Sequence, residues 1–422
     1  MTRPTVASRK RVNPENLARL GAERLAELLT EAAATKPELK RRLRMELAAE
    51  EGGEHLALEI DKRLATLDAS RSKVSWRQRP TFVRDLDGVR VLIAGRLAGL
   101  DRTAALERLW RFMAVSRRVS PRVRDRDGEL AAVFDRAAGD IGALIAGQDA
   151  EPGASALVEA IARDPGGAAL WLPKVLEPAP ADLAAATLRR LSQREDPAPG
   201  WIPIIRLLAD AAGDVDAFAS TFTSAGLRSP QVAADIGRRL LAAGRVADAG
   251  RVLKAGGPPP PSKKLLGGPR AVPPDYDWES AWIDYLERSG DLDAAQAARW
   301  ASFERTLSAE RARAFTSRLT GFEDVEAEGR AFDLAARHPD FERGLQFLME
   351  WPALPEAARM IQARADEIQA PAEAAELWAS RLRARQPAAA HLLLRKAAAA
   401  AFRRRELATC DRLTLEADAI EV

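Results

Sequence analysis

Residues 240–249 of this chain are Leu-Leu-Ala-Ala-Gly-Arg-Val-Ala-Asp-Ala, and residues 286–295 are Leu-Glu-Arg-Ser-Gly-Asp-Leu-Asp-Ala-Ala. Both segments fit the pattern L-x-x-x-G-x-(V/L)-x-x-A, and residues 207–218, around Gly213, repeat it more loosely. A glycine after an apolar helical stretch is typical of a helix that ends in a left-handed turn, and the small alanine lets the next helix pack closely. The pattern therefore predicts helical hairpins that recur along the chain. Such junctions resemble those of tetratricopeptide repeats, although the spaced aromatic and proline of that consensus are absent.

The composition predicts an all-α fold. Apolar residues make up 47% of the 422 residues and charged residues 30%, so the chain can form a core. Alanine, leucine and arginine predominate, and these residues lose little side-chain freedom in a helix. Alternating β-branched runs are nearly absent. Many short helices joined by very short loops predict an α-solenoid, a tetratricopeptide-like array of antiparallel helical hairpins in which each hairpin is stabilised by its neighbours.

Local signals place the first helices. Asn13 followed by Pro14 predicts a helix start, and an apolar stripe then continues to about residue 33. Thr35 and Glu38 have capping-box spacing and predict the start of the next helix. A longer helix is expected over residues 80–99, where apolar residues recur every three or four positions.

We expect five segments along the chain. In order, they are a flexible basic tail (1–13), an N-terminal helical domain with net positive charge (14–150), middle helical repeats (151–255), a Pro/Gly-rich linker (256–274) and C-terminal helical repeats (275–422).

The linker contains four consecutive prolines, residues 258–261, followed by Ser-Lys-Lys. A phosphate-binding loop requires a glycine before the lysine, a Ser or Thr after it and free backbone N–H groups, and these are missing here. A polyproline II ligand is possible, although the run is short. We interpret the segment as an exposed joint between two blocks of repeats.

Charge is distributed unevenly. Residues 1–130 hold 28 Lys and Arg against 19 Asp and Glu, whereas the remainder holds 36 against 42. The asymmetry can indicate an anionic partner for the first third of the chain. Solvated helix faces in an arginine-rich sequence explain it equally simply, and we favour that explanation.

One basic group is the best candidate for contact with an anion or a partner. Arginine together with an aromatic side chain suits phosphate contact and base stacking, although acidic residues are interleaved and no known nucleic-acid motif is present. The candidate residues are Arg41, Arg42, Arg44, Arg71, Lys73, Trp76, Arg77 and Arg79.

Signals for catalysis are weak. The three histidines, His55, His338 and His391, have no metal-binding spacing, and the single cysteine, Cys410, is expected to be a buried thiol on a helix. The acidic cluster over residues 322–328 is explained by the preference of a helix's first turn for carboxylates. We therefore expect no catalytic residues, no cofactor and no metal site.

The first residues lack the apolar stretch of a secretory signal, and no segment approaches the length of a membrane span. We expect a cytoplasmic protein that does not enter a membrane.

Several stretches together resemble an alphaproteobacterial family that is defined by a domain of unknown function. The resemblance extends from about residue 17 to 418 and implies a helical-repeat fold, but no activity and no catalytic residues. The stretches are Leu25–Leu29, Arg41–Ala49 before Gly52-Gly53, Ile60–Leu64, Leu109–Phe112, Ala298–Leu307, Phe322–Glu328 and Leu392–Arg395.

Three functions are compatible with the sequence. The leading hypothesis is a non-enzymatic helical-repeat scaffold that binds a protein or peptide partner. The alternatives are a nucleic-acid-binding protein that uses the basic first third, and an enzyme whose site the sequence does not reveal. Fold alone does not decide among them.

Overall fold

The computed structural model describes residues 12–147, 149–193, 199–258 and 273–421. Within those residues the chain is helical, as predicted, and β-structure is confined to an isolated parallel bridge between Val74 and Val123. The packing divides the chain into two units, Met1–Phe222 and Thr223–Val422. None of the described helices is both long and apolar enough to cross a membrane.

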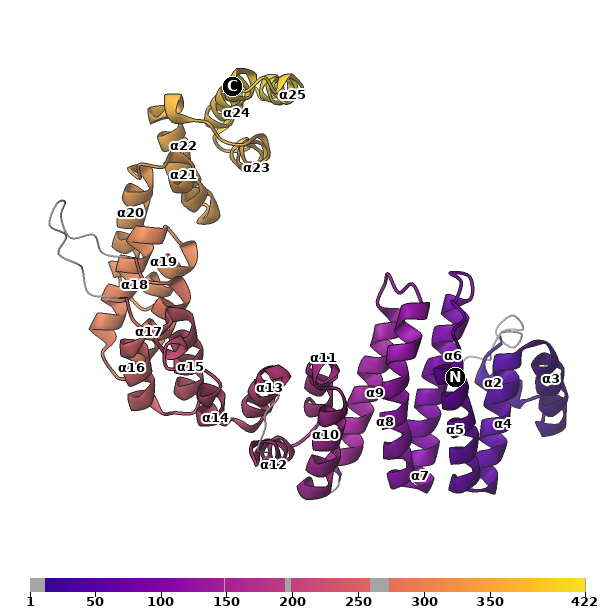
Figure 1. The fold of residues 1–422 in the computed structure, drawn as a ribbon. Coiled ribbons are helices and arrows are strands. Elements are labelled where there is room, and N and C mark those ends of the chain that lie inside the picture. Colours follow the sequence, from indigo (N-terminus) through magenta and orange to yellow (C-terminus); the bar gives the residue numbers. More distant parts are fainter. Residues whose placement is uncertain (1–11, 148, 194–198, 259–272, 422) are drawn as a thin grey trace, which may run out of the picture. The chain divides into compact units, whose positions relative to one another are not determined.

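Unit 1 consists of helices that stand side by side in chain order (Figure 1). A π-helical turn follows α6 without interruption and continues into α7, so these three elements form one long helix. The helices are α2 (Pro14–Ala18), α3 (Ala22–Thr35), α4 (Pro37–Glu51), α5 (Gly53–Ala69), α6 (Arg79–Val91), the π turn (Leu92–Leu97), α7 (Ala98–Leu100), α8 (Arg102–Val119), α9 (Glu129–Ala146), α10 (Ala150–Arg163), α11 (Pro165–Leu176), α12 (Ala181–Ser192), α13 (Ile202–Ala212) and α14 (Val215–Ser220).

Unit 2 has the same organisation. Short connections join most successive helices, the chain between α16 and α17 excepted, and α15 packs against both of these helices. The helices are α15 (Pro230–Ala242), α16 (Val246–Ala255), α17 (Tyr276–Arg288), α18 (Leu292–Thr306), α19 (Ala309–Thr316), α20 (Glu323–Ala336), α21 (Phe341–Glu350), α22 (Leu354–Ala363), α23 (Ala372–Leu382), α24 (Pro387–Arg403) and α25 (Leu407–Asp418).

The repeated glycine pattern forms the turn that it predicts. Gly244 has φ +74° and Gly290 has φ +86°, both in the left-handed region. After each glycine, the next backbone N–H donates to the carbonyl five residues earlier, Arg245 to Leu240 at 2.8 Å and Asp291 to Leu286 at 3.0 Å. The looser copy at Gly213 makes the same bond, from Asp214 to Ala209 at 2.9 Å. Three hairpins of the chain are therefore closed by one local device.

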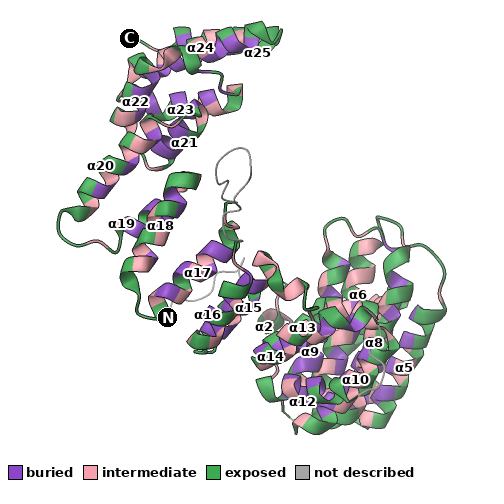
Figure 2. Ribbon diagram, turned by 60° about the vertical axis from the view of Figure 1, so that its left-hand side comes forward, coloured by how far each residue is buried: buried purple, intermediate pink, exposed green. Residues whose placement is uncertain are grey.

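The alanine of the pattern lies in the core, as its small size predicts. Ala249 and Ala295 are both fully buried. Buried and exposed positions alternate along the helices in both units (Figure 2), as expected where each helix buries one stripe against its neighbours.

The predicted first helix is wrong in its extent. Asn13 does cap a helix, accepting a 2.8 Å hydrogen bond from the Asn16 N–H, but α2 ends at Ala18. Gly21 has φ +81°, a conformation that glycine adopts without strain and that separates α2 from α3. The apolar stripe crosses this break, and its residues Leu20, Leu28 and Leu29 are exposed.

The predicted capping box is also wrong. Thr35 is the last residue of α3, and its hydroxyl donates to the Ala32 carbonyl at 3.1 Å. Helix α4 begins at Pro37 without a side-chain cap. Proline is favoured at the first helical position because its φ is already fixed near the helical value, so Pro37 sets this boundary instead.

Two sequence predictions concern residues of which the structure describes only a part. Of the basic tail 1–13, residues 1–11 lie outside the described residues, and of the linker 256–274, residues 259–272 do. The predicted linker is therefore the chain between α16 and α17. The linker and the expected domain limits both remain predictions.

Candidate functional site

A hollow of about 440 Å³ opens between α4 and α6 in unit 1, and we call it the basic hollow. Helix α5 contributes Arg63 to it, and the π turn contributes its first residue, Leu92. Its volume is in the range of sites that hold a small ligand or a few side chains of a peptide. The lining residues are Lys36, Glu38, Leu39, Arg41, Arg42, Met45, Arg63, Thr81, Arg84, Asp85, Gly88, Val89 and Leu92.

Asp85 organises the charged wall of the basic hollow. Its two carboxylate oxygens accept hydrogen bonds from different arginines, Arg41 at 3.2 Å and Arg63 at 2.5 Å. The Arg63 and Asp85 side chains are only 12% and 10% exposed. Burial lowers the pKa of the Arg63 guanidinium, and the nearby Arg41 cation lowers it further, while Asp85 opposes both effects. The single negative charge of Asp85 is thus shared by two guanidinium groups, so this wall keeps a net positive charge.

The rim adds positive charge that other residues do not balance. Lys36 and Arg84 are exposed, and their side chains make no hydrogen bond or ion pair with another described residue. Arg42 lies 4.0 Å from Glu46, at the limit of an ion pair. Among the residues that line the hollow, the cationic side chains outnumber the carboxylates, which are those of Glu38 and Asp85.

The floor of the basic hollow is apolar. Met45, Val89 and Leu92 are each 4% exposed. Gly88 lies beside them on α6, and a Cβ atom added there would meet nothing within 4 Å. The hollow therefore combines a cationic rim with an apolar base, and its open space extends to the α6 backbone.

The structure brings together only part of the predicted basic group. Arg41 and Arg42 line the basic hollow, whereas Arg44, on the same helix, pairs with Glu59 of α5 at 3.4 Å. The others lie in or next to the segment that joins α5 to α6. They are Arg71, Lys73, Trp76, Arg77 and Arg79.

Within this connecting segment, Trp76 is 77% exposed and Arg77 stacks on it, with the guanidinium carbon 5.1 Å from the ring centroid. Arg71 and Lys73 are exposed and have no partner among the described residues. Arg79 instead pairs with Asp127 at 2.7 Å and thereby ties the segment to the chain before α9.

Sequence reasoning missed Lys36, Arg63, Arg84 and Asp85. Arg63 and Asp85 are 22 positions apart and meet only because α5 and α6 pack together. The sequence feature that could have pointed to Asp85 is its position next to an apolar residue of the helix, and not a local concentration of charged residues. Asp85 directly precedes Leu86, which is fully buried, so its carboxylate had to lie at the edge of a packed stripe.

The remaining candidates for chemistry occupy structural positions. Cys410 is half-buried against the unit 2 core. Glu323, Asp324 and Glu326 lie in the first turn of α20, where the helix dipole favours them. In the described part of the chain, no three His, Cys, Asp or Glu side chains gather in a way that could hold a metal ion.

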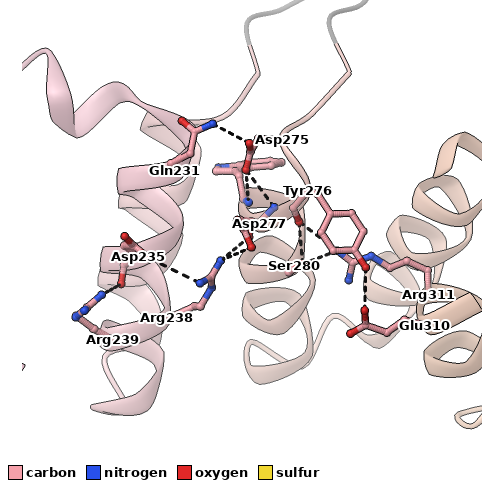
Figure 3. A network of polar contacts seen from close by, with 11 residues as sticks. Gln231, Asp235, Arg238, Arg239, Asp275, Tyr276, Asp277, Ser280, Glu310 and Arg311 are labelled. Carbon is pink, nitrogen blue, oxygen red and sulfur yellow. Dashed lines mark hydrogen bonds and ion pairs between the residues drawn. The ribbon is translucent and has the colours of Figure 1, made fainter. Parts of the chain in front are cut away.

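A polar network in unit 2 links α15, α17 and α19 (Figure 3). Gln231 donates to Asp275 at 2.7 Å, and Arg238 pairs with Asp277 at 3.1 Å. On the other side of α17, the Tyr276 hydroxyl donates to Glu310 at 3.2 Å, and Arg311 lies over the Tyr276 ring. Each of these contacts joins the start of α17 to α15 or to α19, so the network serves packing.

Comparison with known proteins gives one match. The model of a family described as a family of unknown function (DUF6880) matches residues 7–197 and again residues 192–408. The two matches together cover most of the chain. A search of curated proteins finds no match.

Proposed function

The chain belongs to the DUF6880 family of unknown function, and because that membership carries no activity, we propose from the structure that the protein is a non-enzymatic helical-repeat scaffold that binds a protein or peptide partner. We further propose that its helices form a tetratricopeptide-like α-solenoid, and that it acts in a bacterial cytoplasm.

One observation supports the proposal most strongly. If α6, the π turn and α7 are taken as one helix, the main packing contacts in each unit join helices that are one or two places apart in the chain. A compact enzyme folds distant segments around a shared cavity, whereas an array of hairpins packs only on its neighbours. Arrays of this kind expose long surfaces, and partner binding is their common use. The recurrence of one left-handed turn at Gly213, Gly244 and Gly290 supports the same architecture.

The test is recovery of a direct partner. The full chain, tagged and expressed in its native cell, would be purified under mild conditions and cross-linked, and bound proteins would be identified by mass spectrometry. We expect a reproducible partner that also binds when the two purified proteins are mixed. Recovery of no such partner in repeated experiments would contradict the scaffold proposal.

A second candidate, binding of single-stranded nucleic acid, is favoured by the exposed Trp76 with Arg77 stacked on it and the unpaired Arg71 and Lys73 nearby. Bases can stack on such a platform. An electrophoretic shift at two salt concentrations tests it, because phosphate contacts weaken steeply with salt. Loss of the shift in Trp76→Ala would assign binding to this segment. No shift at low salt would exclude it.

A further inference from the structure

The basic hollow has an excess of positive charge that the molecule itself does not neutralise. Asp85 is already shared between Arg41 and Arg63, so it cannot also balance the cations of the rim. Arg84 is exposed and unpaired among the described residues. Guanidinium groups in this arrangement suit carboxylates, which they can bind through two parallel hydrogen bonds.

The apolar floor of the hollow favours ligands that carry an apolar group as well as a negative charge. Met45, Val89 and Leu92 are almost fully buried, but Leu39, which also lines the hollow, is half-buried, so a bare anion would leave this apolar base partly in contact with water. A ligand that also carries an apolar side chain would cover this base and gain the free energy of its burial. The hollow therefore fits a ligand with both negative charge and an apolar group.

The surroundings favour a peptide over nucleic acid. Several arginines elsewhere in unit 1 are neutralised by carboxylates, such as Arg108 by Asp61 at 2.9 Å and Arg90 by Asp87 at 2.7 Å. The unpaired Arg71 and Lys73 do not line the hollow. Nucleic acid is normally held by a continuous basic track along its phosphates. A single cationic hollow with an apolar base instead matches one short acidic segment.

We propose that the basic hollow binds an acidic, amphipathic segment of a protein partner. Its carboxylates pair with Arg84, Arg42 and Lys36, and one apolar side chain enters beside Gly88. This inference rests on the proposed function and adds to it the place and the chemistry of partner binding.

The test uses the full chain and a fluorescein-labelled amphipathic peptide with Glu on one face and Leu on the other. Fluorescence anisotropy should show binding that weakens with added salt. Gly88→Leu fills the hollow, and the space around Gly88 is open, so the variant should fold. We expect it to weaken binding by about tenfold or more, since the new side chain occupies the position of the ligand's apolar group.

Gly99→Leu is the matched control. Gly99, like Gly88, has nothing within 4 Å of an added Cβ, but it lies in α7 and does not line the hollow. It should bind the peptide as the unmodified protein does. Arg84→Glu, which reverses a rim charge, should weaken binding by about tenfold at low salt and less at high salt.

Other outcomes would overturn the inference. These are no binding of the peptide, equal binding by Gly88→Leu, or a Gly88-dependent preference for a single-stranded oligonucleotide. Self-association that Gly88→Leu abolishes would assign the hollow to a second copy instead. If Gly88→Leu still recovers the partner found with the unmodified chain, the hollow is not the site, although the scaffold proposal stands.

Discussion

Arginine side chains connect neighbouring helices throughout this protein. In unit 1, Arg122 donates to the Leu67 carbonyl at 3.1 Å and to the Ser70 hydroxyl at 2.9 Å, and thereby caps the end of α5. In unit 2, Arg299 is 2% exposed and pairs with Glu287 at 2.7 Å. The many arginines are thus explained mainly by packing, and the unpaired ones near the basic hollow stand out against them.

Glu287 is predicted to stabilise unit 2 in a pH-dependent way. A hydrogen bond from Arg318 lowers its pKa from 4.5, burial opposes this, and Arg299 adds to the lowering. Because the folded-state pKa lies below the unfolded one, the contribution is complete above pH 4.5 and is lost as pH falls through the lowered value. Glu287→Gln should reduce the free energy of unfolding by about 2 kcal/mol at neutral pH, since Arg299 loses its counter-ion.

Urea unfolding from neutral pH down to about pH 3 measures this difference, which should shrink as the pH falls. Glu31→Gln is the control, because Glu31 is exposed in the middle of α3 and has no ion pair with a described residue. A difference between Glu287→Gln and the unmodified protein that stays constant with pH would show that the carboxylate charge is not responsible.

Arg405 holds a left-handed conformation that usually belongs to glycine. It has φ +63°, and the following Glu406 N–H donates to the Ala401 carbonyl at 3.0 Å, as in the turn at Gly244. A side chain in this conformation costs about 1 kcal/mol. Arg405→Gly should therefore raise the free energy of unfolding by about 1 kcal/mol.

Thermal unfolding monitored by circular dichroism would detect this gain. Arg403→Gly, at the last helical residue of α24, should instead reduce stability by about 1 kcal/mol because glycine is unfavourable within a helix. Equal effects of the two substitutions would refute the explanation.

At the scale of elements, close approach between helices depends on particular small residues. Helix α9 approaches α11 at Gly142, where an added Cβ would lie 2.1 Å from the Val175 carbonyl oxygen. At Gly139, on the same helix, an added Cβ would meet nothing within 4 Å. One glycine is therefore required for packing, and the other is not.

Gly142→Ala should destabilise unit 1 by about 2 kcal/mol or more, because the helices must separate to admit the methyl group. Gly139→Ala should stabilise it by about 0.5–1 kcal/mol, since alanine favours the helix. Denaturant unfolding of both variants provides the comparison. Loss of stability in both would mean that helix spacing at Gly142 is not the cause.

At the scale of the whole molecule, packing is short-range along the chain. The division falls between Phe222 and Thr223, and within each unit helices contact near neighbours. In such arrays stability is approximately a sum of local terms, so a disturbance spreads over few helices.

Hydrogen–deuterium exchange resolved by mass spectrometry can show this locality. Gly142→Ala should speed exchange in unit 1 helices around α9 and leave α17–α19 unchanged, whereas Glu287→Gln should do the reverse. Faster exchange throughout the chain in either variant would indicate one cooperative structure instead.

The sequence by itself determined the features that depend on neighbouring residues. The all-α fold, the cap at Asn13, the left-handed turns at Gly244 and Gly290 and the buried Ala249 follow from propensities and spacings within one or two helical turns. The local rules failed where two of them competed. At Thr35 the capping-box spacing predicted a helix start, but the preference of proline for the first helical position places the start at Pro37.

Only the tertiary structure decided which charges remain unpaired. Arg41 and Arg44 are three positions apart on one helix, yet one faces Asp85 in the basic hollow and the other pairs with Glu59. No local rule separates them, because their partners lie on different helices and the packing of α4 with α5 and α6 brings each within reach. An ion pair depends on distance in space, and distance between helices is a property of their packing.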